Sequence, residues 1–178
     1  MGCASTASSW PRSAPHLGPV SSFATVAGEN IALIQRGLDA FSRGDFDAGV
    51  ADMDPEIEWH VAFRLPDMPP EKTIYRGPDE VRRLWAAFTS VWEQLTVTLE
   101  EVVEARDDVV VVRARFAGQG SGSGIEVDRT VFYVFEIVAE KLKRLRPFDT
   151  EAEAVLAAAE LRLPRPGLQA SGRNADPE

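Results

Sequence analysis

The apolar residues of this chain change from helical to strand spacing near residue 93, and this change limits the possible folds more than any other feature. Before it, apolar side chains recur at the three- and four-residue spacing of amphipathic helices, most clearly over residues 81–92. After it, they alternate with polar side chains in the period of two that strands show. The predicted strands cover residues 95–103, 109–117, 127–137 and 141–148. Helices followed by an antiparallel meander predict an α+β fold, in which a curved, mostly antiparallel sheet wraps around the N-terminal helices.

Shorter elements precede and follow this pattern. Helices are predicted at 31–42, 46–52 and 150–159, and one more strand at 57–63. Residues 64–76 contain three prolines, which cannot donate ladder hydrogen bonds, so an irregular loop is predicted there. Thr150 and Glu153 have the spacing of a capping box in front of the last helix. The natural cavity of such an architecture lies between the sheet and the helices.

The length of 178 residues fits one domain with tails. Residues 1–27 are rich in Ser, Ala, Pro and Gly and show no periodicity, so we expect a disordered leader. Residues 164–178 have the same character, and we expect a disordered tail there. The patterned domain is therefore predicted to span residues 28–163.

Charge and composition exclude several function classes. The formal net charge of -9 repels the phosphate backbone, so no nucleic-acid partner is expected. No apolar run approaches the ~18 residues that a membrane span needs, and no secretory signal is visible, so we expect a soluble, cytoplasmic protein. One cysteine and two histidines cannot build a Cys- or His-based metal site, and no cofactor-binding motif is visible. We therefore expect neither a metal nor a cofactor.

Five short motifs occur in an order and spacing that together resemble one protein family. They are Phe41-Ser42-Arg43-Gly44-Asp45-Phe46, Asp54-Pro55-Glu56-Ile57-Glu58-Trp59, the stretch from Tyr75 to Arg82, the stretch from Ser121 to Val127, and Leu145-Arg146-Pro147-Phe148-Asp149 ahead of Glu153-Ala154. Over roughly residues 29–161 the chain resembles SnoaL-like proteins of the nuclear transport factor 2-like superfamily, which also holds ketosteroid isomerases, polyketide cyclases and limonene epoxide hydrolase. The resemblance implies a cystatin-like conical barrel, usually dimeric, with an apolar pocket.

The resemblance does not fix a reaction, because this fold hosts many activities. Ketosteroid isomerases hold the enolate oxygen with a tyrosine and a protonated aspartic acid, and Gly37 and Val131 stand at the corresponding positions. The epoxide hydrolase pattern needs an Asp two residues after the Arg, whereas Arg129 is followed by Thr130 and Val131. Both mechanisms therefore lack essential groups here.

His60 and Asp149 are the candidate catalytic bases. An imidazole exchanges protons near neutrality, and His60 falls near the position of the isomerase base. Strict alternation places Trp59 on the apolar face and His60 on the other, and a register slip of one residue would reverse them. Asp149 ends the last predicted strand, where burial could raise its pKa, but an Asp before a helix is also a common cap.

The candidate ligand-binding residues are one arginine and four aromatic residues, Arg129, Trp59, Tyr75, Trp85 and Phe88. Arg129 interrupts an apolar strand, so it needs a partner, which could be Glu58, Asp128, Asp149 or a substrate carboxylate or enolate. Tyr75 either presents its hydroxyl to a ligand or anchors the proline-rich loop. The remaining aromatic residues fit either the core or the pocket wall.

Two functional hypotheses remain open at the level of sequence. The first is a cofactor-independent isomerase, cyclase or dehydratase that abstracts a proton next to a carbonyl of a small apolar or aromatic ligand. The second is a non-catalytic ligand-binding or dimeric interaction module, which the missing oxyanion donors favour. A homodimer is expected because Arg113 and Arg115 share one face of their strand with valines, as an association face would.

Overall fold

The computed structural model describes residues 21–61 and 72–162. The elements in chain order are α1 (Ser21–Ser42), α2 (Phe46–Val50), β1 (Met53–His60), β2 (Ile74–Arg76), α3 (Pro78–Thr89), β3 (Thr96–Arg106), β4 (Val109–Gln119), β5 (Glu126–Val138), β6 (Lys141–Phe148) and α4 (Glu151–Arg162). The expected α+β order of early helices and a late meander is confirmed. In this described part, no helix is long and apolar enough to cross a membrane.

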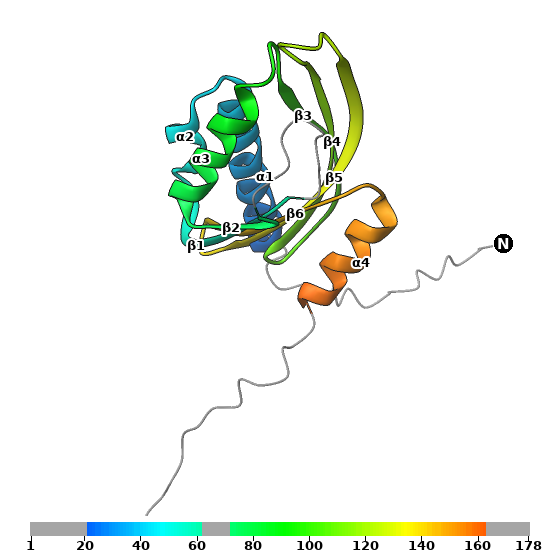
Figure 1. Cartoon of the computed structure of the whole chain (residues 1–178). Coiled ribbons are helices and arrows are strands. Elements are labelled where there is room, and N and C mark those ends of the chain that lie inside the picture. Colours follow the sequence, from blue (N-terminus) through cyan, green and yellow to red (C-terminus); the bar gives the residue numbers. More distant parts are fainter. Residues whose placement is uncertain (1–20, 62–71, 163–178) are drawn as a thin grey trace, which may run out of the picture.

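The strands form one open six-stranded sheet in the order β2-β1-β6-β5-β4-β3. Every neighbouring pair is antiparallel except β1 and β6, which run parallel. The sheet is therefore mixed and mostly antiparallel, as expected, and it is curved without closing into a barrel. Figure 1 shows that α1, α2 and α3 lie on the concave side of this sheet, whereas α4 lies on its convex side.

The alternation of β4 explains why both sides of the sheet can carry helices. Val110, Val112, Ala114 and Phe116 face the concave side and join the main core beneath α1 and α3. On the opposite side, Val109 and Val111 are at most 4% exposed because Ala154, Ala157 and Ala158 of α4 pack against them. Small side chains let the helix approach the sheet closely. The outer-face valines, which the sequence suggested for association between chains, are thus covered within the chain itself.

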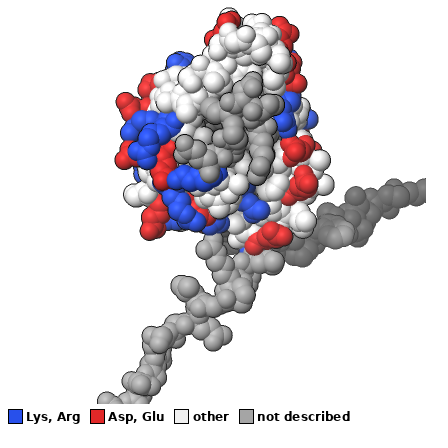
Figure 2. All heavy atoms as spheres, viewed as in Figure 1, with Lys and Arg blue, Asp and Glu red and all other residues white. Residues whose placement is uncertain are grey.

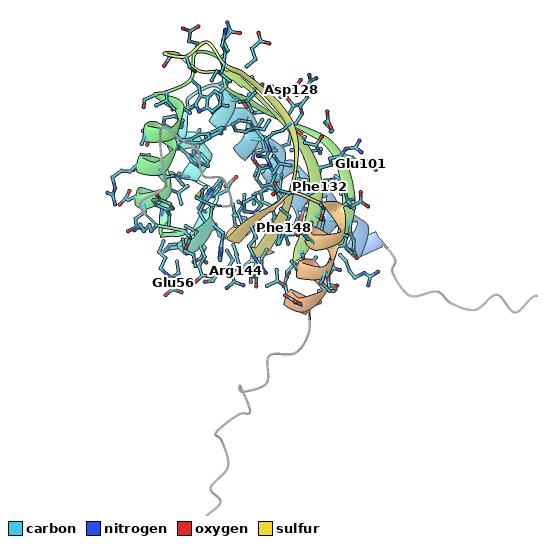
Figure 3. The ribbon with its side chains drawn as sticks, turned by 45° about the vertical axis from the view of Figure 1, so that its right-hand side comes forward. Glu56, Glu101, Asp128, Phe132, Arg144 and Phe148 are labelled. Carbon is cyan, nitrogen blue, oxygen red and sulfur yellow. The ribbon has the colours of Figure 1, made fainter. Side chains whose placement is uncertain are left out.

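Thr150 begins α4 in the way that the sequence predicts. Its Oγ1 accepts a hydrogen bond from the Glu153 amide at 3.4 Å, as in a capping box, and donates one to the Glu153 carboxylate at 2.8 Å. Phe132 and Phe148 lie beside this helix on the convex face (Figure 3). The cap therefore fixes where the chain leaves β6 and turns back over the sheet.

Some boundaries differ from the sequence prediction. Helix α1 starts at Ser21 and so includes residues 21–27, which we expected in the leader. Strand β1 starts at Met53 instead of residue 57, and β2 falls within the stretch predicted as loop. Strand β2 pairs with β1 at the edge of the sheet, where a three-residue strand is enough. The rest of the leader, the tail from residue 164 and most of the proline-rich loop lie outside the described residues.

Candidate functional site

A cavity of about 110 Å³ lies between the concave face of the sheet and the three helices that cover it. Its wall is mainly apolar, with α1 contributing Leu33 and Leu38, α3 contributing Leu84, and the sheet contributing Val97, Phe116 and Leu142. A water molecule needs roughly 10–15 Å³ of such volume, so the space holds several water-sized groups. An apolar space of this kind favours an apolar ligand over water.

Trp85 is the centre of the aromatic wall. It is 4% exposed, and its ring centroid lies 5.0 Å from Phe41 and 5.1 Å from Trp59, both edge to face. A Cβ at Gly49 would lie 2.5 Å from Trp85 Cζ3, so the short helix α2 can approach the indole only because this residue has no side chain. Trp59, Trp85 and Phe88, three of the sequence-predicted ligand-binding residues, line the cavity.

Tyr75 does not belong to this lining. It pairs with Trp59 across β1 and β2, is 8% exposed, and packs into the main core. The Lys72 ammonium lies 5.2 Å from the centre of its ring. Its contacts are those of a residue that fixes the edge strand to the core.

His60 lies at the end of β1, at the edge between the cavity and the convex face. Ile57 and Trp59 point into the core, so Glu58 and His60 belong to the convex side. The imidazole Nε2 is 3.8 Å from Glu58 Oε2, and Glu58 also accepts a hydrogen bond from Arg144 at 2.9 Å. His60 borders the cavity, yet its side chain is 28% exposed and its Nε2 is enclosed without a hydrogen-bond partner in the described part of the chain.

This convex-side environment is highly charged. Glu58 bonds to Arg76 and Arg144, and Arg144 also donates to Glu136 at 2.8 Å. The Arg144 hydrogen bond holds the pKa of Glu58 below its usual value. Figure 3 places Arg144 on the side of the sheet away from α1, α2 and α3, and Figure 2 shows acidic and basic side chains intermixed on the face seen in Figure 1. His60 therefore faces an ion-pair network as well as the cavity edge.

We expect His60 to titrate below the value of 6.5 that an ordinary histidine shows. Burial lowers its pKa most, and the positive charge of Arg146 lowers it further, while Glu58 opposes the shift. Because the folded-state pKa is depressed, the unfolded chain binds the proton more readily, so the His60 contribution to stability falls as the pH drops below ~6.5. A titration followed by the imidazole resonances in NMR checks this, with His60→Gln used to assign the signal. A pKa above 6.5 would contradict the placement.

Arg129 on β5 and Asp149, which follows β6, form an ion pair. Arg129 pairs in register with Phe116, so it continues the concave-face row of β5. Asp149 follows the lining residue Pro147 by two positions, directly after the end of β6. The two side chains are 40% and 69% exposed, so the pair itself stabilises the fold little. Asp149 is held by Arg129, while Thr150 caps the helix.

Tyr133 is a polar lining residue that the sequence reasoning did not select. It is 8% exposed, lies on the central strand β5 and borders the cavity. Burial raises the pKa of its phenol, so the hydroxyl keeps its proton at neutral pH. The sequence pattern could have identified it, because Tyr133 alternates with Val131 and Phe135 on the face of the strand that points toward the helices. Across the described residues, His, Cys, Asp and Glu side chains form no group of three suited to a metal ion.

Comparison with solved structures supports the fold at low sequence identity. TerC, co-crystallised with polyporic acid, aligns with a TM-score of 0.60 and 18% identity over 74% of this chain and 98% of its own. A protein of a Jannaschia species that carries the name of a SnoaL-like polyketide cyclase aligns at 0.56 and 22% identity over 74% of this chain and 91% of its own. An uncharacterised cystatin-fold protein from Novosphingobium aromaticivorans aligns at 0.56 and 17% identity over 67% of this chain and 97% of its own.

Comparison with curated proteins gives no significant match. The SnoaL-like domain, in contrast, matches residues 34–145, which include most of the residues that line the cavity. This match covers more than half of the chain and agrees with the resemblance carried by the five motifs. The chain belongs to the SnoaL-like domain family.

Proposed function

We propose that this protein binds a small apolar or aromatic ligand that carries a carbonyl group. The observation that carries the proposal is the cavity between the helices and the concave face of the sheet, whose wall is built of aliphatic and aromatic side chains. A ligand that fills such a space gains most of its affinity from buried apolar area. Few polar groups border the cavity, so they would orient the ligand and not provide most of the affinity.

The carbonyl part of the proposal rests on the polar groups that border the cavity. Tyr133 and Trp59 bring donors, whereas Asp52 already accepts a hydrogen bond from Arg36 at 2.8 Å. A ligand oxygen is therefore better matched to this wall than a ligand ammonium group. TerC, a relative in fold, was crystallised with polyporic acid, which is consistent with a pocket of this kind in the fold.

Turnover is the second candidate function. It would be proton abstraction next to a carbonyl, as in an isomerase, cyclase or dehydratase, and the Asp149 carboxylate two positions beyond the lining residue Pro147 favours it. Asp149 is paired with Arg129, which could stabilise the oxyanion that forms. His60 is the other possible base, although its Nε2 is turned toward Glu58. The geometry supports binding better than turnover, since neither base points freely into the cavity.

The dimeric form of this proposal uses the part of the convex face that α4 leaves open. There Arg113 pairs with Glu100 and Glu101, and Arg115 pairs with Asp128. Phe132 lies between these pairs and α4 (Figure 3). A face that carries both signs of charge around an aromatic group suits a second copy of itself.

A simple aromatic ketone tests binding and turnover in one sample. We expect 2-acetylnaphthalene to bind saturably with one site per chain in equilibrium dialysis. For a pure binder, its methyl protons should exchange with D₂O no faster than in buffer, as followed by NMR. Exchange that is faster with protein and falls 100-fold or more in Asp149→Asn would establish Asp149 as a base and favour the enzyme. Absence of saturable binding would overturn the proposed function.

A further inference from the structure

Tyr133 brings a hydroxyl group to the cavity lining from strand β5. Strand β5 lies between β4 and β6, so Tyr133 is flanked by Val112 on one side and Pro147 on the other. Neither neighbour offers a polar side chain. Within the described residues, Tyr133 makes no side-chain hydrogen bond, although the residue is only 8% exposed.

The surroundings of this hydroxyl differ from those of the other buried donors. The indole Nε1 atoms of Trp85 and Trp92 are enclosed by neighbouring atoms and lack a partner among the described residues. The Tyr133 oxygen is not among these enclosed atoms without a partner in the described part of the chain, and the residue lines the cavity. A donor that is shielded from bulk solvent but open to a cavity is available to a ligand and to little else.

The hydroxyl keeps its proton, because burial raises the phenol pKa. At neutral pH the hydroxyl can therefore donate a hydrogen bond to an oxygen acceptor. A neutral hydrogen bond in a shielded site is worth more than one at the surface. Trp59 and His60 are competing donors in the lining, but both belong to β1 near the sheet edge and are more exposed.

We propose that the Tyr133 hydroxyl donates a hydrogen bond to the carbonyl oxygen of the bound ligand and so selects ketones over hydrocarbons of the same shape. This inference rests on the proposed function, since it assigns the polar anchor of the same cavity. In this proposal Tyr133 contributes to binding and specificity. Tyr133 does not act as the base in any proton abstraction.

The test compares two ligands that differ only at the proposed acceptor. 2-Acetylnaphthalene carries a carbonyl oxygen, and 2-isopropenylnaphthalene replaces it with a methylene group of similar size. Equilibrium dialysis gives Kd for both ligands with the wild-type protein and with Tyr133→Phe, which removes one oxygen atom. We expect the ratio of the two Kd values to shift against the ketone by about tenfold in Tyr133→Phe, ~1.4 kcal/mol.

The chain offers a matched control, because Tyr75 is its only other tyrosine. Tyr75 is equally buried but does not line the cavity, so Tyr75→Phe should leave the ratio unchanged. Circular dichroism and thermal unfolding confirm that each variant folds. An unchanged ratio in Tyr133→Phe, or a shift found in Trp59→Phe instead, would overturn the inference while leaving cavity binding intact. Failure of both ligands to bind the wild-type protein would overturn the proposed function itself.

Discussion

Trp85→Ala should lower the free energy of unfolding by about 3–5 kcal/mol, the usual cost of removing a large buried aromatic side chain. Trp85 is 4% exposed and touches the rings of Phe41, Phe46 and Trp59. The substitution therefore removes the contact that joins α3 to α1, α2 and β1. Urea unfolding followed by circular dichroism measures the change.

Leu156→Ala is the control for this experiment, because Leu156 is 63% exposed on α4. It should change the free energy of unfolding by no more than about 0.5 kcal/mol. A cost below about 1 kcal/mol would contradict this role of Trp85. It would mean that Trp85 neither holds α3 against the other helices nor forms the centre of the aromatic wall.

Gly37→Phe should abolish ligand binding while leaving the fold intact. Gly37 lies on α1 and lines the cavity, and a Cβ built there would have no heavy atom within 4 Å. A phenyl group at this position would extend into the open space and occupy the volume that a ligand needs. The change also removes a helix-interior glycine, which offsets part of any strain. We expect the Kd of 2-acetylnaphthalene to rise at least about 100-fold, the effect of losing most of the buried apolar contact.

Gly28→Phe provides the matched control on the same helix. A Cβ at Gly28 would also meet no heavy atom within 4 Å, but this residue is exposed and does not line the cavity. The Kd of 2-acetylnaphthalene for Gly28→Phe should equal that for the wild-type protein. Equal loss of binding in both variants would point to a general effect on α1, and retention of binding by a well-folded Gly37→Phe would place the ligand elsewhere.

The sequence predicts the parts of the fold that depend on repeated patterns. The alternation in β4 and β5 is long enough to define which residues face the helices, and the stripe of α3 places Trp85 and Phe88 toward the sheet. The capping box at Thr150 and Glu153 is also visible in sequence, because its hydrogen bonds join residues three apart.

Features that depend on contacts between distant segments could not be predicted in the same way. The α4 stripe does not reveal which face of the sheet it covers, so the burial of Val109 and Val111 under Ala158 was missed. Strand β2 is only three residues long and forms through pairing with β1. Asp149 was one of several possible partners of Arg129, and only the register of β5 and β6 brings the two together.

The position of the ligand is the central claim, and NMR can test it directly. Intermolecular nuclear Overhauser effects should connect protons of bound 2-acetylnaphthalene to methyl groups that line the cavity, those of Leu38, Val97 and Leu142. Methyl groups of Val155 and Leu156, which are exposed on α4, should give none. Effects confined to Val155 and Leu156, or to any surface outside the cavity lining, would contradict the assignment of this cavity as the ligand site.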